Sequence, residues 1–387
     1  MIAIVNGNLY TMSDGIIEDG IILIEDGKIK EIGKNIEIKE DMEIIDAKGL
    51  MVTPGIVDGH SHIGIGEEGV GFEGYDYNET SDPITPHLRA IDAIYPCDRA
   101  FIQAYQGGIT SVVTGPGSAN AIGGTFLAMK TYGKRVDDMV IKNPVAMKMA
   151  FGENVKRVYK DKGPKTRMAI AAIIRESLYK AIEYSEKKDR GENPPFDMKL
   201  EALIPVIKGE LIVKAHAHRT DDIFTAIRIA KEFNLKMTLE HCTEGHLIGD
   251  EIKEEGFMCI LGPNMTSASK YELKNRSYIT PRVFYEKGIK FGLMTDNSVI
   301  PSPLLPVAAG MAVRSGLDPY EALKAITINN AEITGINDRV GSLEKGKDAD
   351  IVIWTKNPVL DIDNEAEIVI INGQIVYKNG EDEKEGF

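Results

Sequence analysis

The chain has little cysteine and no long apolar segment. Only three of its 387 residues are cysteines, Cys97, Cys242 and Cys259, and they are too scattered for a disulfide framework. No run of 18 or more apolar residues occurs, which argues against a membrane-spanning helix. The first residues, "MIAIVNGNLYTMSDG", lack the basic and apolar regions of a signal peptide. The sequence therefore predicts a soluble cytoplasmic protein with no membrane partner.

Basic residues are also in deficit. The chain has 45 lysines and arginines against 59 aspartates and glutamates, which gives a formal net charge of -14. A phosphate backbone requires a basic surface, so nucleic acid is excluded as a partner and a small-molecule substrate is expected. Hydrophobic residues at 43% and charged residues at 27% are typical of a globular enzyme. The length fits a barrel-sized domain with an accessory unit.

Both ends of the chain have the pattern of β-structure. Strand-like runs broken by Asn-Gly and Asp-Gly turns occur in "IAIVNGNLYTM", "GIILIEDGKIKEIG", "DADIVIWTK" and "AEIVIINGQIVYKNG". An isolated hairpin at each end would leave its edges exposed, and pairing the two ends removes that liability. We therefore expect residues 1–53 and 338–387 to form one composite β-sandwich domain.

The middle of the chain alternates strand and helix patterns. Apolar strand-like runs include "GITSVVTGPG", "NPVAMKMAFG", "GELIVKAHAH", "LKMTLEHC" and "IKFGLMTDN", and amphipathic stretches such as "RTDDIFTAIRIAKEFN" separate several of them. This alternation predicts parallel βαβ units. Roughly eight units fit a TIM-like (β/α)8 barrel over residues 54–337, in which functional groups belong at the carboxyl ends of the strands.

Histidine and aspartate occur at the ends of four predicted strands. His60 and His62 follow "GIVDG", His216 and His218 end "ELIVKAHAH", His241 follows "LKMTLE", and Asp296 follows "IKFGLMT". Neutral imidazole and carboxylate are the usual ligands of zinc and related divalent ions. An open site of this kind would lower the pKa of a bound water to about 7.

A less specific interpretation exists for each histidine. A lone buried histidine is usually a hydrogen-bonded core residue, but five of the seven histidines cluster at strand ends here. We therefore interpret His60, His62, His216, His241 and Asp296 as a metal site. His87 and His246 lack a strand context, so we expect them in loops or on the surface.

With these residues, the chain resembles the amidohydrolase superfamily of metal-dependent hydrolases, most closely its imidazolonepropionase-like and prolidase-like branch. The motifs that carry the resemblance are "VTPGIVDGHSHIG", "GITSVVTG", "AHAH", "LEHC", "LMTDNS" and "VGSLEKGKDADIVIW". The resemblance implies His60, His62, His216 and His241 as ligands and Asp296 as both ligand and general base. It also implies a divalent cofactor, with Zn²⁺ as our first expectation, and a homo-oligomer.

Lys148 is a further candidate for the ligand set. Binuclear members of the family carry a lysine at the end of the fourth strand, whose carbamate bridges two metals, and Lys148 in "NPVAMKMAFGEN" fits that place. A lysine in an apolar run is costly unless neutralised or paired, and the neutral amine is the form that takes up carbon dioxide. Alternatively, Lys148 extends to the rim or pairs with Glu153. One or two metals, and a carboxylated or unmodified Lys148, both stay open.

The predicted reaction is hydrolysis of a C–N bond in a cyclic amide or a small peptide-like amide. A water activated by the metal attacks a carbonyl or amidine carbon, and Asp296 takes its proton and later passes it to the leaving nitrogen. His218 or His241 would stabilise the developing oxyanion. A deaminase of an aminated heterocycle is the alternative on the same site. A non-catalytic scaffold would have lost ligands, and none of the five is missing.

Three segments offer substrate contacts. The long connection "GEEGVGFEGYDYNETSDPITPHLRAIDAIYPCDRAF" contains Tyr77, which we predict to bind substrate, beside Tyr75 and Glu79; a structural loop or a subunit contact is an equal alternative. Arg219 could bind a substrate carboxylate, or form a salt bridge at a helix N-terminus. In "LGPNMTSASKYELKNRS" the candidate is Asn264, together with Arg276. The glycine-rich "TGPGSANAIGG" lacks the P-loop ending, so we expect a tight turn at the rim.

Overall fold

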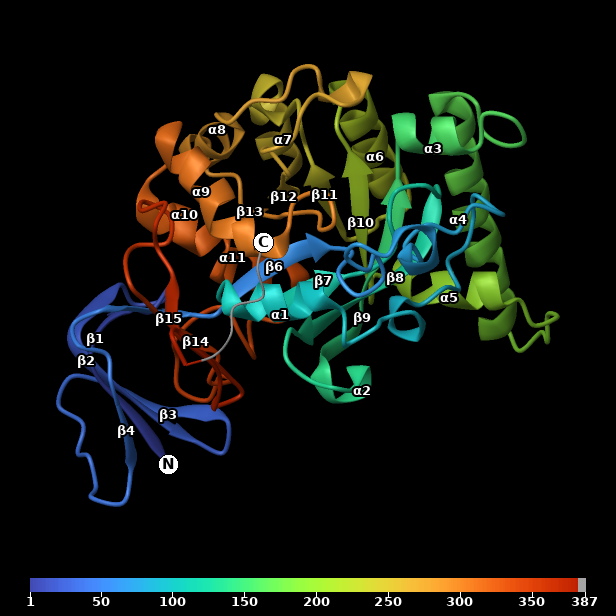
Figure 1. Ribbon diagram of the computed structural model, residues 1–387. Coiled ribbons are helices and arrows are strands. Elements are labelled where there is room, and N and C mark those ends of the chain that lie inside the picture. Colours follow the sequence, from blue (N-terminus) through green and yellow to red (C-terminus); the bar gives the residue numbers. More distant parts are fainter. Residues whose placement is uncertain (382–387) are drawn as a thin grey trace.

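The computed structural model describes residues 1–381, in which two eight-stranded sheets form (Figure 1). We call them the terminal sheet and the barrel sheet. The terminal sheet contains strands from both ends of the chain: β1 (Ile2–Tyr10), β2 (Ile16–Glu25), β3 (Lys28–Gly33), β4 (Glu43–Asp46), β5 (Met51–Pro54), β14 (Ile351–Trp354), β15 (Ala366–Ile371) and β16 (Gln374–Lys378).

The two ends of the chain meet where β5 pairs antiparallel with β14. Val352 lies opposite Thr53, and the Trp354 indole donates a hydrogen bond of 2.8 Å to the Thr53 hydroxyl. The strand order is β16-β15-β14-β5-β1-β2-β3, and β4 also pairs with β1. Both ends therefore share one hydrogen-bonded sheet. Its description as a β-sandwich, and the domain bounds 1–53, 338–387 and 54–337, stay predictions; residues 382–387 lie outside the described part.

The barrel sheet has the order β13-β12-β11-β10-β9-β8-β7-β6 and is nearly closed. Its strands are β6 (Ile56–Ser61), β7 (Ile109–Thr114), β8 (Ile122–Lys130), β9 (Val140–Ala150), β10 (Ile212–Ala217), β11 (Met237–His241), β12 (Met258–Leu261) and β13 (Phe291–Leu293). Neighbouring strands are parallel except around β8, which is antiparallel to both β7 and β9.

Strand β8 corrects our expectation of eight uniform βαβ units. Residues 115–121 connect β7 to β8, and a parallel crossover needs a dozen residues or more. The short connection therefore forces the chain to turn back. The glycine-rich segment forms this turn as expected, but its last residues, Ile122 to Gly124, already belong to β8.

A single side chain hydrogen-bonds to both β6 and β13 where the barrel sheet closes. The Asn330 amide nitrogen donates to Val57 O of β6 and to Leu293 O of β13, each at 2.7 Å. This approach requires glycine at position 292, because a Cβ there would lie 1.8 Å from Asn330 Oδ1. The bridge holds together β6, which carries His60, and β13, which precedes Asp296.

Helices surround the barrel sheet (Figure 1). In α6, the buried residues Ile223, Ala226, Ile227 and Ala230 recur at helical spacing, which presents one apolar face to the barrel. None of the helices in residues 1–381 is long and apolar enough to cross a membrane. The helices are α1 (Arg99–Gln106), α2 (Val136–Met139), α3 (Glu153–Val158), α4 (Arg167–Asp189), α5 (Met198–Ile207), α6 (Thr220–Glu232), α7 (Gly249–Glu255), α8 (Thr280–Glu286), α9 (Leu305–Arg314), α10 (Pro319–Ala325) and α11 (Ile328–Thr334), with 3-10 turns η1 (Gly71–Gly74), η2 (Ala90–Asp92), η3 (Gly245–Leu247), η4 (Tyr271–Leu273) and η5 (Ser302–Leu304).

Candidate metal centre

The predicted histidines and Asp296 converge at one end of the barrel as two groups of possible ligands. The first group is His60, His62 and Asp296, and the second is His216, His218 and His241. Within each group, one ligand atom per residue lies within 4.8 Å of the others. The ligands come from the carboxyl ends of β6, β10 and β11 and from the residues just after β13, as a parallel barrel requires.

The first group is compact. Asp296 Oδ1 lies 3.1 Å from His62 Nε2 and 3.8 Å from His60 Nε2. The other ring nitrogen of each histidine has a hydrogen-bond partner on the side away from Asp296. His60 Nδ1 lies 2.7 Å from Glu240 Oε2, and His62 Nδ1 lies 2.6 Å from Gly115 O. Each Nδ1 donor leaves Nε2 to face the centre, which is the usual arrangement behind a metal-binding histidine.

The second group shows the same orientation. His241 Nδ1 lies 2.8 Å from Gly262 O, and His218 Nδ1 lies 2.7 Å from Thr243 Oγ1. His241 Nε2 and both nitrogens of His216 are buried and have no hydrogen-bond partner in the described structure. Buried polar atoms without partners are rare and costly, so these nitrogens fit a metal ion as their missing partner.

The backbone conformation of two ligands is also unusual. His241 has φ 72° and Asp296 has φ 54°, in the left-handed region that non-glycine residues seldom adopt. Such conformations persist where the surrounding structure imposes them, and they concentrate at functional sites. The strain directs both side chains to the same rim.

Burial favours the neutral form of four imidazoles at the site. It lowers the pKa of His60, His216 and His218 well below the usual value and that of His241 to about 4. Burial alone would raise the pKa of Asp296, but its hydrogen bond with His62 and the nearby His241 lower it to about 2. At neutral pH the site therefore offers imidazole lone pairs and a carboxylate, the forms that bind divalent ions.

Lys148 lies where the sequence places it, beside the first group. Its ammonium is fully buried, 3.1 Å from His60 Nε2, and burial lowers its pKa to about 8. The alternative pairing with Glu153 is not supported, because a Glu153 carboxylate oxygen accepts instead from the Glu272 backbone N–H at 3.2 Å. A lysine inside the ligand set whose pKa lies this close to neutral pH is compatible with a carbamate, which stays a prediction.

Sequence analysis missed the buried charges behind the first group. Glu240 accepts from His60 Nδ1, from Lys214 Nζ at 3.0 Å and from Thr238 Oγ1 at 2.6 Å. Asp58 accepts from the Thr295 hydroxyl and backbone, which ties β6 to the residues before Asp296. Glu240, Lys214 and Asp58 lie in the strands that carry the ligands, and charged residues inside apolar strands were the signal that could have revealed them.

Lys270 and Glu272 were missed as well. Lys270 Nζ lies 3.1 Å from His218 Nε2 and 2.7 Å from Glu272 Oε1. The Glu272 side chain is fully buried, although the residue belongs to the irregular connection between β12 and α8. In this connection the sequence predicts contacts from Asn264 and Arg276, whereas Lys270 and Glu272 are revealed only by their buried charged pair in the structure.

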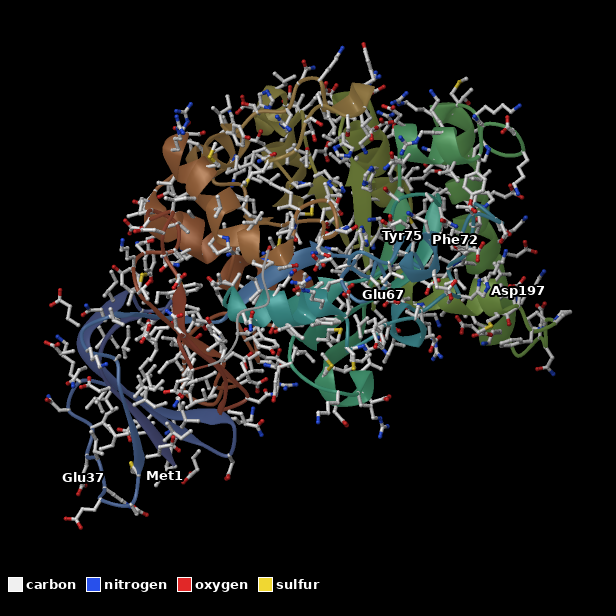
Figure 2. All side chains as sticks on the ribbon, in the orientation of Figure 1. Met1, Glu37, Glu67, Phe72, Tyr75 and Asp197 are labelled. Carbon is white, nitrogen blue, oxygen red and sulfur yellow. The ribbon has the colours of Figure 1, made fainter. Side chains whose placement is uncertain are left out.

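A cavity of about 360 Å³ opens over both groups. Tyr77 lines it and stacks on His62 with ring centroids 5.5 Å apart, so the structure brings this predicted substrate contact to the site. Gly117 and Ser118 of the glycine-rich turn also line it. The connection that carries Tyr77 also carries Glu67, Phe72 and Tyr75 (Figure 2). Tyr75 packs against Tyr77 but is 49% exposed.

Other predicted substrate contacts do not line this cavity. Arg219 forms two hydrogen bonds with the Asp221 carboxylate at 2.9 and 3.0 Å, which is the salt bridge at the start of α6 that we held as the alternative. Asn264 is not among the residues that line the cavity, whereas its neighbours Pro263 and Thr266 are. Arg276 lies 3.3 Å from Thr266 Oγ1. Glu79 Oε1 accepts a hydrogen bond from the Ser81 backbone N–H.

The two remaining histidines lie outside both ligand groups. His246 is in η3, where its Nδ1 lies 3.2 Å from Thr280 Oγ1, and His87 is in the long connection after β6. Their positions agree with the expectation of loop residues.

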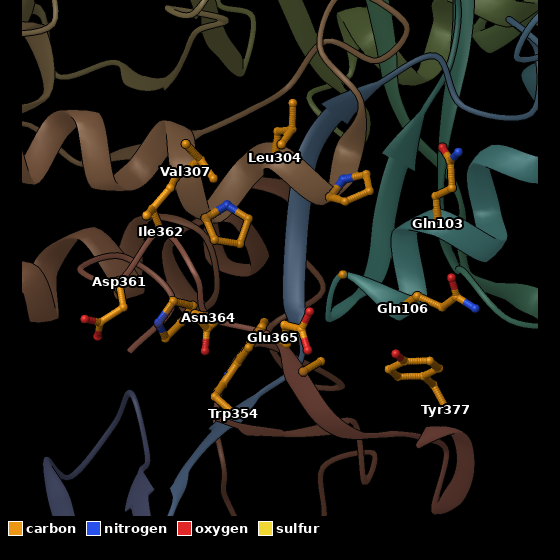
Figure 3. Close-up of a pocket in the computed structure, with 15 residues that line it drawn as sticks. Gln103, Gln106, Leu304, Val307, Trp354, Asp361, Ile362, Asn364, Glu365 and Tyr377 are labelled. Atoms are coloured by element: carbon orange, nitrogen blue, oxygen red, sulfur yellow. The ribbon is translucent and has the colours of Figure 1, made fainter. Parts of the chain in front are cut away.

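A second cavity, of about 310 Å³, lies between α1, the η5–α9 segment and the terminal sheet (Figure 3). Trp354, Tyr377, Leu304, Val307 and Ile362 contribute to its walls. None of the residues lining it within residues 1–381 belongs to either ligand group. The candidate reaction site is therefore the cavity over the metal ligands.

Comparison with known proteins gives a consistent result. Residues 51–376 match the model of the Amidohydrolase family. The amidohydrolase tasK of Hapsidospora irregularis is 30% identical over 91% of this chain, which corresponds to 39% of that protein's length. The imidazolonepropionase of Thermoplasma volcanium is 29% identical, over 96% of this chain and 95% of that protein.

A solved structure agrees over the whole length. The amidohydrolase from Thermotoga maritima has a TM-score of 0.94 and 40% sequence identity, covering 98% of this chain and 100% of that chain. The resemblance seen in the sequence motifs is confirmed, and with it the class of hydrolases that act on carbon–nitrogen bonds. The chain belongs to the amidohydrolase family.

Proposed function

We propose that this protein is a metal-dependent hydrolase that cleaves the C–N bond of a cyclic amide or a small peptide-like amide. The observation that carries the proposal is the convergence of two ligand groups, one of which contains Asp296, beneath one cavity. One ion would be held by His60, His62 and Asp296. A second ion would be held by His216, His218 and His241. Zn²⁺ is the ion we expect, because the donors are mainly imidazole nitrogens. Such an ion polarises a carbonyl and lowers the pKa of a bound water.

The protein residues supply proton transfer and orientation. Asp296 is ionised at neutral pH and faces the cavity, so it can take a proton from the attacking water and return it to the leaving nitrogen. His218 lines the cavity, and the ring centroids of His218 and His241 lie 4.5 Å apart. Whichever of the two does not bind an ion would stabilise a developing oxyanion. Tyr77 stacks on His62 and forms a wall against which a planar amide can lie. Arg219 and Asn264 stay in the proposal only as groups that would reach a bound substrate after movement.

Lys148 would hold the two ions together as a carbamate. With a pKa of about 8, its neutral fraction at pH 7 is of the order of a tenth, against less than a thousandth for an ordinary lysine. The amine nitrogen adds to carbon dioxide and loses a proton, which leaves one carboxylate with two oxygens. A cytoplasmic location and a homo-oligomer stay predictions.

The test is a hydrolysis panel with the metal-loaded protein. Cyclic amides, hydantoin-like rings, dipeptides and aminated heterocycles are incubated with protein that was stripped of metal and reloaded with Zn²⁺. We expect a new carboxylate and amine from an amide, and no turnover by the stripped protein. Ammonia release from the heterocycles without a new carboxylate would favour the deaminase. Equal turnover with and without metal would contradict the proposal.

A further inference from the structure

The Lys270 ammonium lies among the ligands of the second group. It is 3.1 Å from His218 Nε2, 2.7 Å from Glu272 Oε1 and 3.3 Å from Asn154 Oδ1. Its side chain is only 14% exposed, and that of Glu272 is fully buried. A cation supplied by the chain thus occupies the side of His218 that faces the other imidazoles.

An ammonium and a metal ion need the same electron pair of His218. Its Nδ1 is held by the Thr243 hydroxyl, so Nε2 is the nitrogen that faces Lys270. A nitrogen lone pair either accepts one N–H or binds one metal ion. An ion bound to His218 therefore requires Lys270 to withdraw, and the repulsion between two cations acts in the same direction.

The Glu272 carboxylate is placed to bind the same ion once Lys270 withdraws. Its Oε1 lies 3.5 Å from His218 Nε2 and 3.9 Å from His216 Nε2. Its Oε2 is anchored by the Glu153 backbone N–H at 3.0 Å. Together with the partnerless nitrogens of His216 and His241, these atoms offer nitrogen donors and one carboxylate, a donor set typical of a zinc site.

The first group has a lysine as well, but in a different setting. Lys148 lies in β9, which is paired with β8 on one side and with β10 on the other, so its backbone is fixed. Lys270 lies in the connection between β12 and α8, and no strand pairing within residues 1–381 includes it. Of the two lysines, Lys270 is the one whose ammonium can leave the ligands by movement of its side chain and its loop.

We infer that Lys270 controls metal occupancy of the second group: its ammonium and a second divalent ion exclude each other at His218, and Glu272 is an additional ligand of that ion. The inference rests on the metal centre of the proposed function, and it adds an order of loading. The first group meets an ammonium as well, since Lys148 Nζ lies 3.1 Å from His60 Nε2, but the proposed carbamate would remove that positive charge while the Lys148 backbone stays in place. The second group binds its ion only after Lys270 has withdrawn from His218.

The test is a Zn²⁺ titration of the metal-free protein, followed by equilibrium dialysis and elemental analysis. We expect the unaltered protein to bind one ion tightly and a second at least tenfold more weakly. Lys270→Met should raise the affinity for the second ion at least tenfold and leave the first unchanged. Lys274→Met is the matched control, because Lys274 lies on the same connection, is exposed, and directs its ammonium to Tyr271.

Glu272→Gln gives an independent readout. Loss of the carboxylate charge should lower the affinity for the second ion at least tenfold, with the first ion retained. Two ions of equal affinity in the unaltered protein, or an unchanged second affinity in Lys270→Met, would overturn the inference alone. A protein that binds no ion in any form would instead contradict the proposed function.

Discussion

The core of the terminal sheet and the rim of the barrel sheet bury opposite kinds of side chain. The core of the terminal sheet is a cluster of isoleucine, leucine, valine and alanine from β1, β2, β5, β14 and β15 and the segments around them. The rim of the barrel sheet instead buries two lysines, several acids and five histidines, among them Lys148, Lys214, Glu240 and Asp58 with no exposed surface. Burying aliphatic groups stabilises a fold, whereas burying charges costs free energy unless each is paired. The difference indicates that the aliphatic cores, among them that of the terminal sheet, stabilise the fold, and that the buried charges at the barrel rim cost part of this stability.

Replacement at the rim should affect catalysis most. Asp296→Asn removes the group that accepts the proton, so we expect kcat to fall by about 10³-fold. The amide occupies the same volume, so the thermal unfolding midpoint should change little. Steady-state kinetics and calorimetry on the same preparation separate the two effects. Full activity in this variant would show that Asp296 is not the base.

The next largest effect concerns stability at the rim. Glu240→Gln removes the charge that pairs with Lys214 and orients His60, and we expect unfolding to become easier by about 4 kcal/mol, because an uncompensated buried charge remains. Ion affinity of the first group should fall too. Denaturant unfolding measures the change, and Glu25→Gln, in the exposed pair with Lys30, is the control that should change it by less than about 1 kcal/mol. Equal losses of stability in the two variants would contradict the view that the buried charges at the rim matter more than exposed ones.

The junction of the two sheets should show an intermediate effect. The buried Asp348 carboxylate pairs with Lys28 at 3.0 Å, Lys130 at 2.9 Å and Arg339 at 2.7 Å. Burial would raise its pKa, but these cations lower it to about 2. Asp348→Asn should therefore cost about 3 kcal/mol at pH 7.

The sign of the pH dependence follows from that shift. The folded pKa lies below the usual 3.8, so the stabilisation, about 2 kcal/mol, is complete above pH 4 and is lost as the pH falls toward 2. Unfolding curves from pH 5 to 2 should show this loss in the unaltered protein and a smaller one in Asp348→Asn. Parallel curves for the two proteins would contradict the assignment.

The smallest effect should come from the terminal sheet. Ile353 is 1% exposed in the aliphatic cluster, and Ile353→Val removes one methylene, so we expect a loss of about 1 kcal/mol. Metal content and kcat should stay the same. A change in either would show that the terminal sheet contributes to the chemistry as well.

Much of this site could be predicted because its ligand residues lie at the ends of strands. Histidine pairs after apolar runs, as at His60 and His216, are visible in the sequence, and the barrel geometry that brings strand ends together is general. Family membership was predictable for the same reason, since the motifs lie at those strand ends. The pairing of the two chain ends followed from their matching β-patterns.

Other features depend on contacts that no local pattern encodes. The reversed direction of β8 follows from the short connection that precedes it. In the sequence, the last residues of the glycine-rich segment have the pattern of a turn, whereas in the structure they begin β8. Lys270 and Glu272 occupy an irregular connection, where neither period nor spacing indicates which side chain turns inward. Arg219 follows the histidine pair directly in sequence, yet its guanidinium turns to Asp221 because that carboxylate is two residues away.

The most direct measurement is anomalous diffraction from crystals grown with Zn²⁺. Data collected on both sides of the zinc absorption edge locate the ion without reference to any assumed chemistry. The account predicts a peak about 2.0–2.2 Å from the Nε2 atoms of His60 and His62, and a weaker one at His216 and His241 that strengthens in Lys270→Met. A map with no peak at either group would contradict it.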